Sequence, residues 1–124
     1  MAVAFLPSAL RDQWVSCFNF MKKIFISGKI TGEPIQECYE KFHYAWLMIL
    51  EGWNGFCHAD SAVNPLELEG IHFGISHVEA MKICFEALKE CTHIYMLKDW
   101  KQSKGAIMEH QYALDNGLTI IYEK

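Results

Sequence analysis

The sequence lacks the long apolar runs and the blocks of like charge that mark membrane and nucleic-acid-binding proteins. No uninterrupted apolar run of about 18 residues occurs in the chain, so we expect no transmembrane helix and no membrane partner. No basic run occurs either, and the formal net charge is -4. Because a protein that binds duplex nucleic acid normally carries a basic surface, we expect no such partner. A small anionic ligand remains compatible with this charge, since backbone N–H groups and helix N-termini bind phosphates.

Paired cysteine spacing is also missing. The chain has 5 cysteines, an odd number, and none of them forms a C-x-x-C pair. This argues against a disulfide framework or a zinc cluster and predicts reduced thiols in a cytoplasmic protein. The histidines show no spacing typical of a metal site, so we expect neither a metal nor another cofactor.

What the sequence does have is an α/β pattern in 124 residues, of which 52% are apolar and 21% charged. This length and composition suit one globular domain with a single core. Short apolar runs alternate with longer segments of helical periodicity. We expect strands at 24–27, 56–63, 92–97 and 118–122, and helices at 34–52, 78–91 and 104–116. This alternation predicts a parallel sheet of four to five strands with right-handed crossovers.

The first twenty residues stand apart from this pattern. Residues 1–10 are apolar, but Arg11 and Asp12 follow and no basic segment precedes them, so a signal peptide is a poor match. Met21, followed by two lysines, resembles a natural start. We therefore expect the domain at 21–124 and interpret 1–20 as an N-terminal extension. An alternative upstream start, an artificially added segment and an arm for oligomer contacts all remain open.

Three polar loops follow three of the expected strands at one edge of the sheet. They span 27–32, 64–74 and 98–105. In a doubly wound sheet these loops converge in one ligand-binding crevice. The first loop combines the hydroxyls of Ser27 and Thr31 with two glycines and a helix N-terminus, which suits a phosphate. It matches neither a P-loop nor G-x-G-x-x-G, so a plain strand–helix turn is the alternative.

Glu109 is the candidate chemical group. Its helix neighbours at three and four positions are Gly105, Ala106, Tyr112 and Ala113. Three of these are small and leave room for a ligand to reach the carboxylate. An enclosed carboxylate can attack a sugar carbon that passes through an oxocarbenium-like state. The alternative is a solvated glutamate near the favourable end of the helix dipole. Trp100, in the loop before this helix, either stacks on a base or packs within the loop.

Three motifs together resemble the DUF4406 family over about residues 21–124. They are Phe25-Ile26-Ser27-Gly28-Lys29-Ile30-Thr31-Gly32, Asn64-Pro65, and Trp100-x-x-Ser103-Lys104-Gly105-Ala106-x-x-Glu109. Members of this family, often carried by phages and bacteria, look like the nucleoside 2-deoxyribosyltransferase superfamily. The resemblance implies a flavodoxin-like three-layer α/β fold and a homo-oligomer, a dimer or larger.

The resemblance also implies a reaction, cleavage of the N-glycosidic bond of a nucleotide or nucleoside, or base exchange. A glutamate attacks C1′ in this superfamily, and that role falls on Glu109. Asp99 matches an aspartate that precedes the nucleophile. Implied substrate contacts are Phe25, Ser27, Gly28, Lys29, Ile30, Thr31, Gly32, Asn64, Pro65, Trp100, Ser103 and Gly105. The helix at 78–91 offers no clear aspartate to protonate the leaving base. The alternative function is a non-catalytic nucleotide-binding protein, a sensor or a sequestering protein.

The aromatic content predicts assembly. The chain has 8 phenylalanines and 4 tryptophans, more apolar surface than one thin sheet is expected to hide. A closed symmetric homodimer is the default arrangement for such a chain. We expect the first helix to form the contact through Tyr39, Phe42 and Trp46, with Trp53 nearby.

Overall fold

One parallel sheet forms the centre of the protein. The computed structural model describes residues 22–52 and 61–124, so the predicted extension at 1–20 and Trp53 lie outside the described residues. The spatial order of the strands is β2-β1-β3-β4, and every neighbouring pair is parallel. The strands are β1 (Lys23–Ser27), β2 (Ser61–Val63), β3 (His93–Met96) and β4 (Thr119–Tyr122). The described part of the sheet therefore has four strands, within the predicted four to five.

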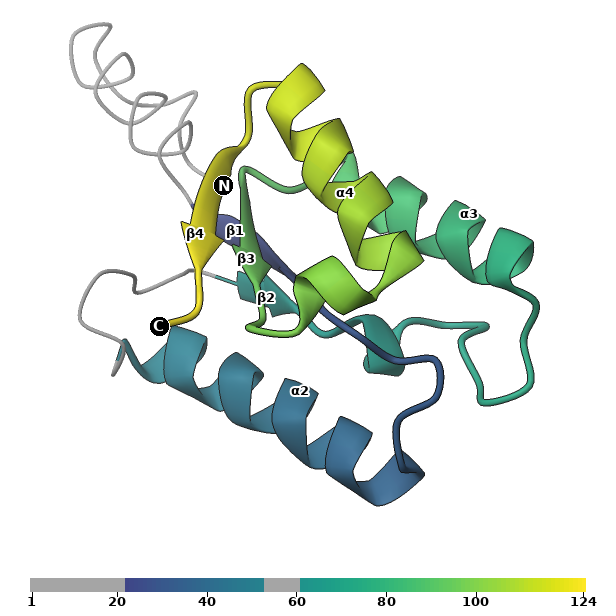
Figure 1. Cartoon of the computed structure of the whole chain (residues 1–124). Coiled ribbons are helices and arrows are strands. Elements are labelled where there is room, and N and C mark those ends of the chain that lie inside the picture. Colours follow the sequence, from purple (N-terminus) through teal and green to yellow (C-terminus); the bar gives the residue numbers. More distant parts are fainter. Residues whose placement is uncertain (1–21, 53–60) are drawn as a thin grey trace, which may run out of the picture.

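Helices cover both faces of this sheet (Figure 1). The helices are α2 (Ile35–Glu51), α3 (His77–Leu88) and α4 (Lys104–Asp115), with two short 3-10 helices, η2 (Pro65–Glu67) and η3 (Trp100–Gln102). Helix α2 packs on one face, and α3 and α4 pack on the other. These three layers confirm the predicted α/β flavodoxin-like sandwich. Within the described ranges, no helix has the length and apolar character needed to span a membrane.

The apolar run of β1 builds both halves of the core. Successive side chains of a strand point to opposite faces. Ile24 and Ile26 therefore join the cluster under α2, whereas Phe25 joins the cluster under α3 and α4. All three side chains are completely buried. A parallel strand that is covered on both faces is expected to be apolar at every position. The continuous apolar run in the sequence therefore predicts this strand.

Helix ends follow local signals where such signals exist. Gly52 ends α2 with a φ of 72°, a left-handed conformation that glycine adopts readily. The Ser103 hydroxyl begins α4 by accepting a hydrogen bond from the Ala106 N–H at 3.1 Å. Helix α3 ends at Leu88, before its predicted end at Cys91. Cys91 lies in the turn after the helix and is buried. The apolar periodicity in the sequence therefore extends beyond the last helical residue, and the predicted end was too late.

Candidate active site

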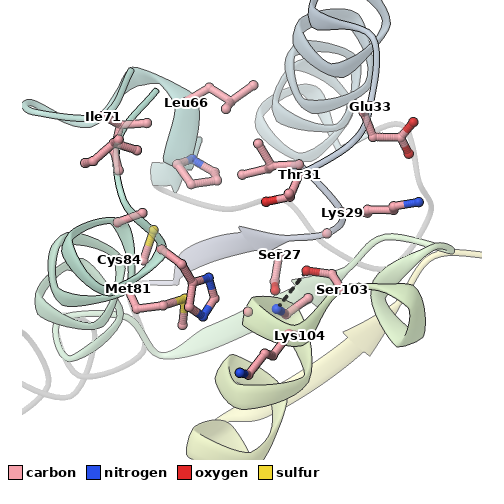
Figure 2. Close-up of a pocket in the computed structure, with 18 of the residues that line it drawn as sticks. Ser27, Lys29, Thr31, Glu33, Leu66, Ile71, Met81, Cys84, Ser103 and Lys104 are labelled. Carbon is pink, nitrogen blue, oxygen red and sulfur yellow. Dashed lines mark hydrogen bonds between the residues drawn. The ribbon is translucent and has the colours of Figure 1, made fainter. Parts of the chain in front are cut away.

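A cavity of about 710 Å³ lies at the carboxyl edge of the sheet, where the three predicted loops meet. Its walls come from residues 26–33, η2, residues 71–75, the first part of α3 and the start of α4 (Figure 2). The lining contains apolar side chains such as Leu66 and Met81 together with a few polar groups. A mostly apolar cavity with a few polar groups and a volume of about 300–1,000 Å³ is typical of a small-molecule site.

Glu109 lies in this cavity lining and is 6% exposed. The Ser27 hydroxyl, at the end of β1, donates a hydrogen bond to Glu109 Oε1 at 2.6 Å. The Cys84 thiol of α3 also hydrogen-bonds the carboxyl group. Burial raises the pKa of Glu109 from 4.5 to about 7, while the two hydrogen bonds act in the opposite direction. The alternative of a solvated helix glutamate is therefore wrong.

Small residues on α4 bring this carboxylate so deep into the fold. Ala106 and Ala113 are buried in the core cluster below α3 and α4. At Gly105, a methyl group would lie 3.0 Å from Met81 Sδ of α3, so glycine permits the close approach of the two helices. Gly105 and Ala106 line the cavity beside Glu109, as their size predicts, whereas Ala113 serves the packing alone.

The loop after β1 forms a second wall of the cavity. Gly28 is required for packing, because a methyl group there would lie 2.6 Å from Leu97 Cδ1. Gly32 adopts a φ of 84°, which residues with a Cβ rarely adopt. Thr31 and Lys29 follow the buried Ser27 along this wall (Figure 2). The loop is thus shaped by its glycines and is more than a plain strand–helix turn, since it walls the cavity.

Most of the predicted contact residues meet at the cavity. Those that line it are Ser27, Gly28, Lys29, Ile30, Thr31, Gly32, Pro65, Ser103 and Gly105, together with Glu109. They come from three segments that lie far apart in the sequence. This convergence is what the position of the loops at one sheet edge predicts.

Four predicted site residues lie elsewhere. Phe25 is completely buried in the core, and Asn64 caps η2 by accepting a hydrogen bond from the Leu66 N–H at 3.0 Å. The Asp99 carboxylate is 2.6 Å from Lys41 Nζ. The Trp100 ring stacks on His110, with ring centroids 4.2 Å apart. None of the four lines the cavity, so each contributes through packing or through the loops that it holds.

Helix α3 and the segment before it contribute residues that the sequence pattern does not single out. Cys84, Met81, His72 and His77 all line the cavity. The periodicity of α3 assigns Met81 and Cys84 to the core, and they are indeed buried. Nothing in that local pattern indicates that this part of the core borders a cavity. Burial, and next the neighbouring Glu109, raises the pKa of the Cys84 thiol to about 12, so it stays protonated and can donate to the carboxylate.

The lining carries charged groups of both signs. Lys29, Lys104 and the N-terminus of α4 belong to this lining together with Glu33 and Glu109. Backbone N–H groups at a helix N-terminus attract anions. In the ranges that the structure describes, no three histidine, cysteine or acidic side chains come together in a group that could hold a metal ion.

Comparison with known proteins gives one match. The sequence model of a family described as "Domain of unknown function (DUF4406)" matches residues 22–122. No curated protein and no solved structure is similar enough to the chain to give a match. The match covers the whole sheet, all three helices and every wall of the cavity.

Proposed function

The chain belongs to the DUF4406 family, and from this premise we propose that it cleaves the N-glycosidic bond of a nucleotide or nucleoside, with Glu109 as the nucleophile. The proposal depends on one observation, the buried carboxyl group of Glu109 in the lining of a ligand-sized cavity. A carboxyl group with a strongly shifted pKa inside a cavity is a candidate for chemistry. The resemblance of the motifs to the nucleoside 2-deoxyribosyltransferase superfamily supports the same assignment.

The proposed reaction has two steps. The ionised carboxylate of Glu109 attacks C1′ of the sugar, the C1′–N bond breaks, and its electron pair leaves with the base, which takes up a proton from the solvent. A glycosyl ester on Glu109 results. Water then attacks C1′ and yields the free sugar, or a second base attacks and yields a new nucleoside. Either attack returns Glu109 as a carboxylate.

The surroundings of Glu109 suit this role. Ser27 and Cys84 each donate a hydrogen bond, so they orient the carboxylate while leaving room at the cavity. In a site of low dielectric constant, a negative charge stabilises the positive charge that develops at C1′ more strongly than it does in water. Burial raises the pKa of Glu109 to about 7, so the ionised form that is competent for attack is present near neutral pH.

Binding without turnover is the second candidate, and one observation favours it. Among the described residues, the acidic side chains that line the cavity are Glu33 and Glu109. Glu33 lies 3.6 Å from Lys41 Nζ, so it is engaged in an ion pair. No free carboxylic acid besides Glu109 thus stands ready in this lining to protonate a leaving base. A protein that holds a nucleotide as a sensor or a sequestering protein does not need one.

Chromatography of the reaction products separates the two candidates. The protein is incubated with a panel of nucleosides and nucleoside 5′-monophosphates, and free base is quantified. Base release supports N-glycosidic cleavage. Calorimetric binding of a nucleotide without base release supports the second candidate. If the protein neither binds nor cleaves any compound of the panel, both candidates are refuted.

A further inference from the structure

Lys41 of α2 joins segments that lie far apart in the sequence. Its Nζ is 2.6 Å from Asp99 Oδ2 and donates a hydrogen bond to the Lys29 C=O at 2.7 Å. The Lys29 N–H in turn donates to Asp99 Oδ1 at 3.0 Å. The backbone of Lys29 is therefore held at its N–H and its C=O by two side chains that are ion-paired with each other. We call Lys41, Asp99 and the Lys29 backbone the clamp.

The clamp lies behind the cavity wall. Residues 26–33 line the cavity, whereas neither Lys41 nor Asp99 does. The side chains of Lys41 and Asp99 are only 26% and 21% exposed, so solvent screens their attraction less than that of a surface pair. The backbone that they hold follows closely after Ser27, the residue that donates to Glu109.

We propose that Lys41 is a positioning residue, which acts through Asp99 and the Lys29 backbone to hold the loop at 28–33 in the geometry that binds the ligand. The inference rests on the proposed function for the identity of that ligand. It gives Asp99 a holding role in place of a contact with substrate. Because a displacement of about 1 Å in a positioning element can cost about 100-fold, opening the clamp weakens a site that the Lys41 and Asp99 side chains do not line.

Matched variants isolate the clamp. Lys41→Met and Asp99→Asn each remove one charge and keep the length of the side chain. Lys41→Arg keeps a cation that can donate to both Asp99 and the Lys29 C=O. Lys89→Met is the control, because it breaks the exposed ion pair with Glu86 at 2.8 Å on α3.

Steady-state kinetics with a nucleoside 5′-monophosphate give the first readout. We expect Lys41→Met and Asp99→Asn each to raise KM about tenfold while kcat stays within about threefold, the pattern of lost binding geometry. The KM of the double variant is no higher than that of Lys41→Met, since both substitutions open the same clamp and only Lys41→Met also breaks the ion pair with Glu33. Lys41→Arg restores most of the lost affinity, and Lys89→Met leaves KM unchanged. A lowered melting temperature with unchanged KM in both clamp variants overturns the proposal.

Hydrogen exchange of the backbone amides at 29–33 gives a readout that needs no turnover. We expect faster exchange there in folded Lys41→Met and Asp99→Asn, and unchanged exchange within α4. Unchanged exchange at 29–33 overturns the clamp even if the wild-type protein releases base. Faster exchange in a protein that releases no base supports the clamp and overturns the proposed function, so the two failures are distinguishable.

Discussion

Glu109 and Glu37 show how burial decides the chemistry of a helical glutamate. Glu37 is exposed in the first turn of α2, whereas Glu109 is buried in α4 and accepts a hydrogen bond from Ser27. Loss of water disfavours the charge on Glu109, and the same loss strengthens the attraction of the ionised carboxylate for any positive charge close to it. Burial of a carboxyl group thus lowers the stability of the folded protein and at the same time makes the group more reactive. This trade-off is common in active sites.

Replacing Glu109 by glutamine tests the nucleophile. Glutamine keeps the shape and can still accept the hydrogen bond from Ser27, but it cannot form a glycosyl ester. We expect Glu109→Gln to lower kcat by about a thousandfold or more while the dissociation constant of the nucleotide changes little. Chromatography and calorimetry measure the two quantities, and Glu37→Gln serves as the control. Base release at the wild-type rate by folded Glu109→Gln or Glu109→Ala would exclude the nucleophile role.

The pH dependence of stability tests the burial of the same group. The folded protein keeps the Glu109 proton up to about pH 7, whereas an ordinary glutamate loses it near pH 4.5. The stabilisation from this raised pKa is therefore complete below pH 4.5 and is lost as the pH rises through about 7. Glu109→Gln cannot ionise, so at pH 8 we expect it to exceed the wild-type free energy of unfolding by about 1–3 kcal/mol.

Urea unfolding at pH 5 and pH 8 measures this difference. The advantage of Glu109→Gln over the wild type should grow between the two pH values, and Glu37→Gln should show no such growth. The comparison with the wild type cancels the titration of the histidines, which all three proteins share. An advantage that is equal at both pH values would mean that Glu109 ionises as it does in the unfolded chain.

At the scale of elements, the loop after β1 and the start of α4 face the cavity together. Lys29 of the loop lines the cavity, and so do Ser103 and the first residues of α4, Lys104 and Gly105. These groups complement a phosphate in charge and in hydrogen bonding. The two elements reach the same place because β1 and β3 are parallel neighbours, whose carboxyl ends lie at the same edge of the sheet.

This arrangement predicts a preference for monophosphates. A charge-assisted hydrogen bond contributes about 1.5–3 kcal/mol, so we expect a nucleoside monophosphate to bind at least about tenfold more tightly than its nucleoside. The Lys29→Ala/Ser103→Ala double variant should lose this preference in calorimetry. Ser103→Ala also removes the N-cap of α4, and Ser76→Ala, which removes the N-cap of α3, controls for a lost cap. Equal binding of both compounds by the wild type would contradict the prediction.

At the scale of the whole molecule, α2 leaves apolar surface exposed, and Tyr39, which is 40% exposed, is the one of the three residues predicted on this helix that belongs to this surface. Phe42 is completely buried in the core, and Trp46 packs against the core and donates a hydrogen bond to the Ala62 C=O at 3.1 Å. Neither is therefore available as the main contact. Tyr44 is 62% exposed and Leu47 is 38% exposed, and both lie on α2. We therefore expect these two residues, together with Tyr39, to form the predicted homodimer contact.

Light scattering tests the assembly. We expect a mass of twice the 14.3 kDa of one chain at micromolar concentration. The Tyr44→Glu/Leu47→Glu double variant should shift the protein to a monomer, because two charges at an apolar contact cannot be desolvated cheaply. Ile107→Glu/Leu114→Glu places the same charges on exposed apolar positions of α4 and should leave the dimer intact. A wild-type monomer would refute the prediction.

The sequence by itself determined the layers of the fold and the position of Glu109 on its helix. The run Ile24 to Ile26 is apolar at every position, which is how a strand covered on both faces must be built. Ser103 and Gly105 mark the start of a helix, and Glu109 lies on its next turn. These features are local, since each depends on residues within a few positions of one another. Periodicity and capping express such features directly in the sequence.

Only the tertiary structure decided which side chains surround the carboxyl group of Glu109. Asp99 lies in a loop that the sequence assigns to the site, yet Lys41, which is 58 positions away, holds its carboxylate behind the cavity wall. Cys84 has the pattern of a core residue, yet it hydrogen-bonds Glu109. A helical pattern states which face is apolar, but not which distant segment packs against it. Packing between segments that are far apart in the sequence therefore determines the site.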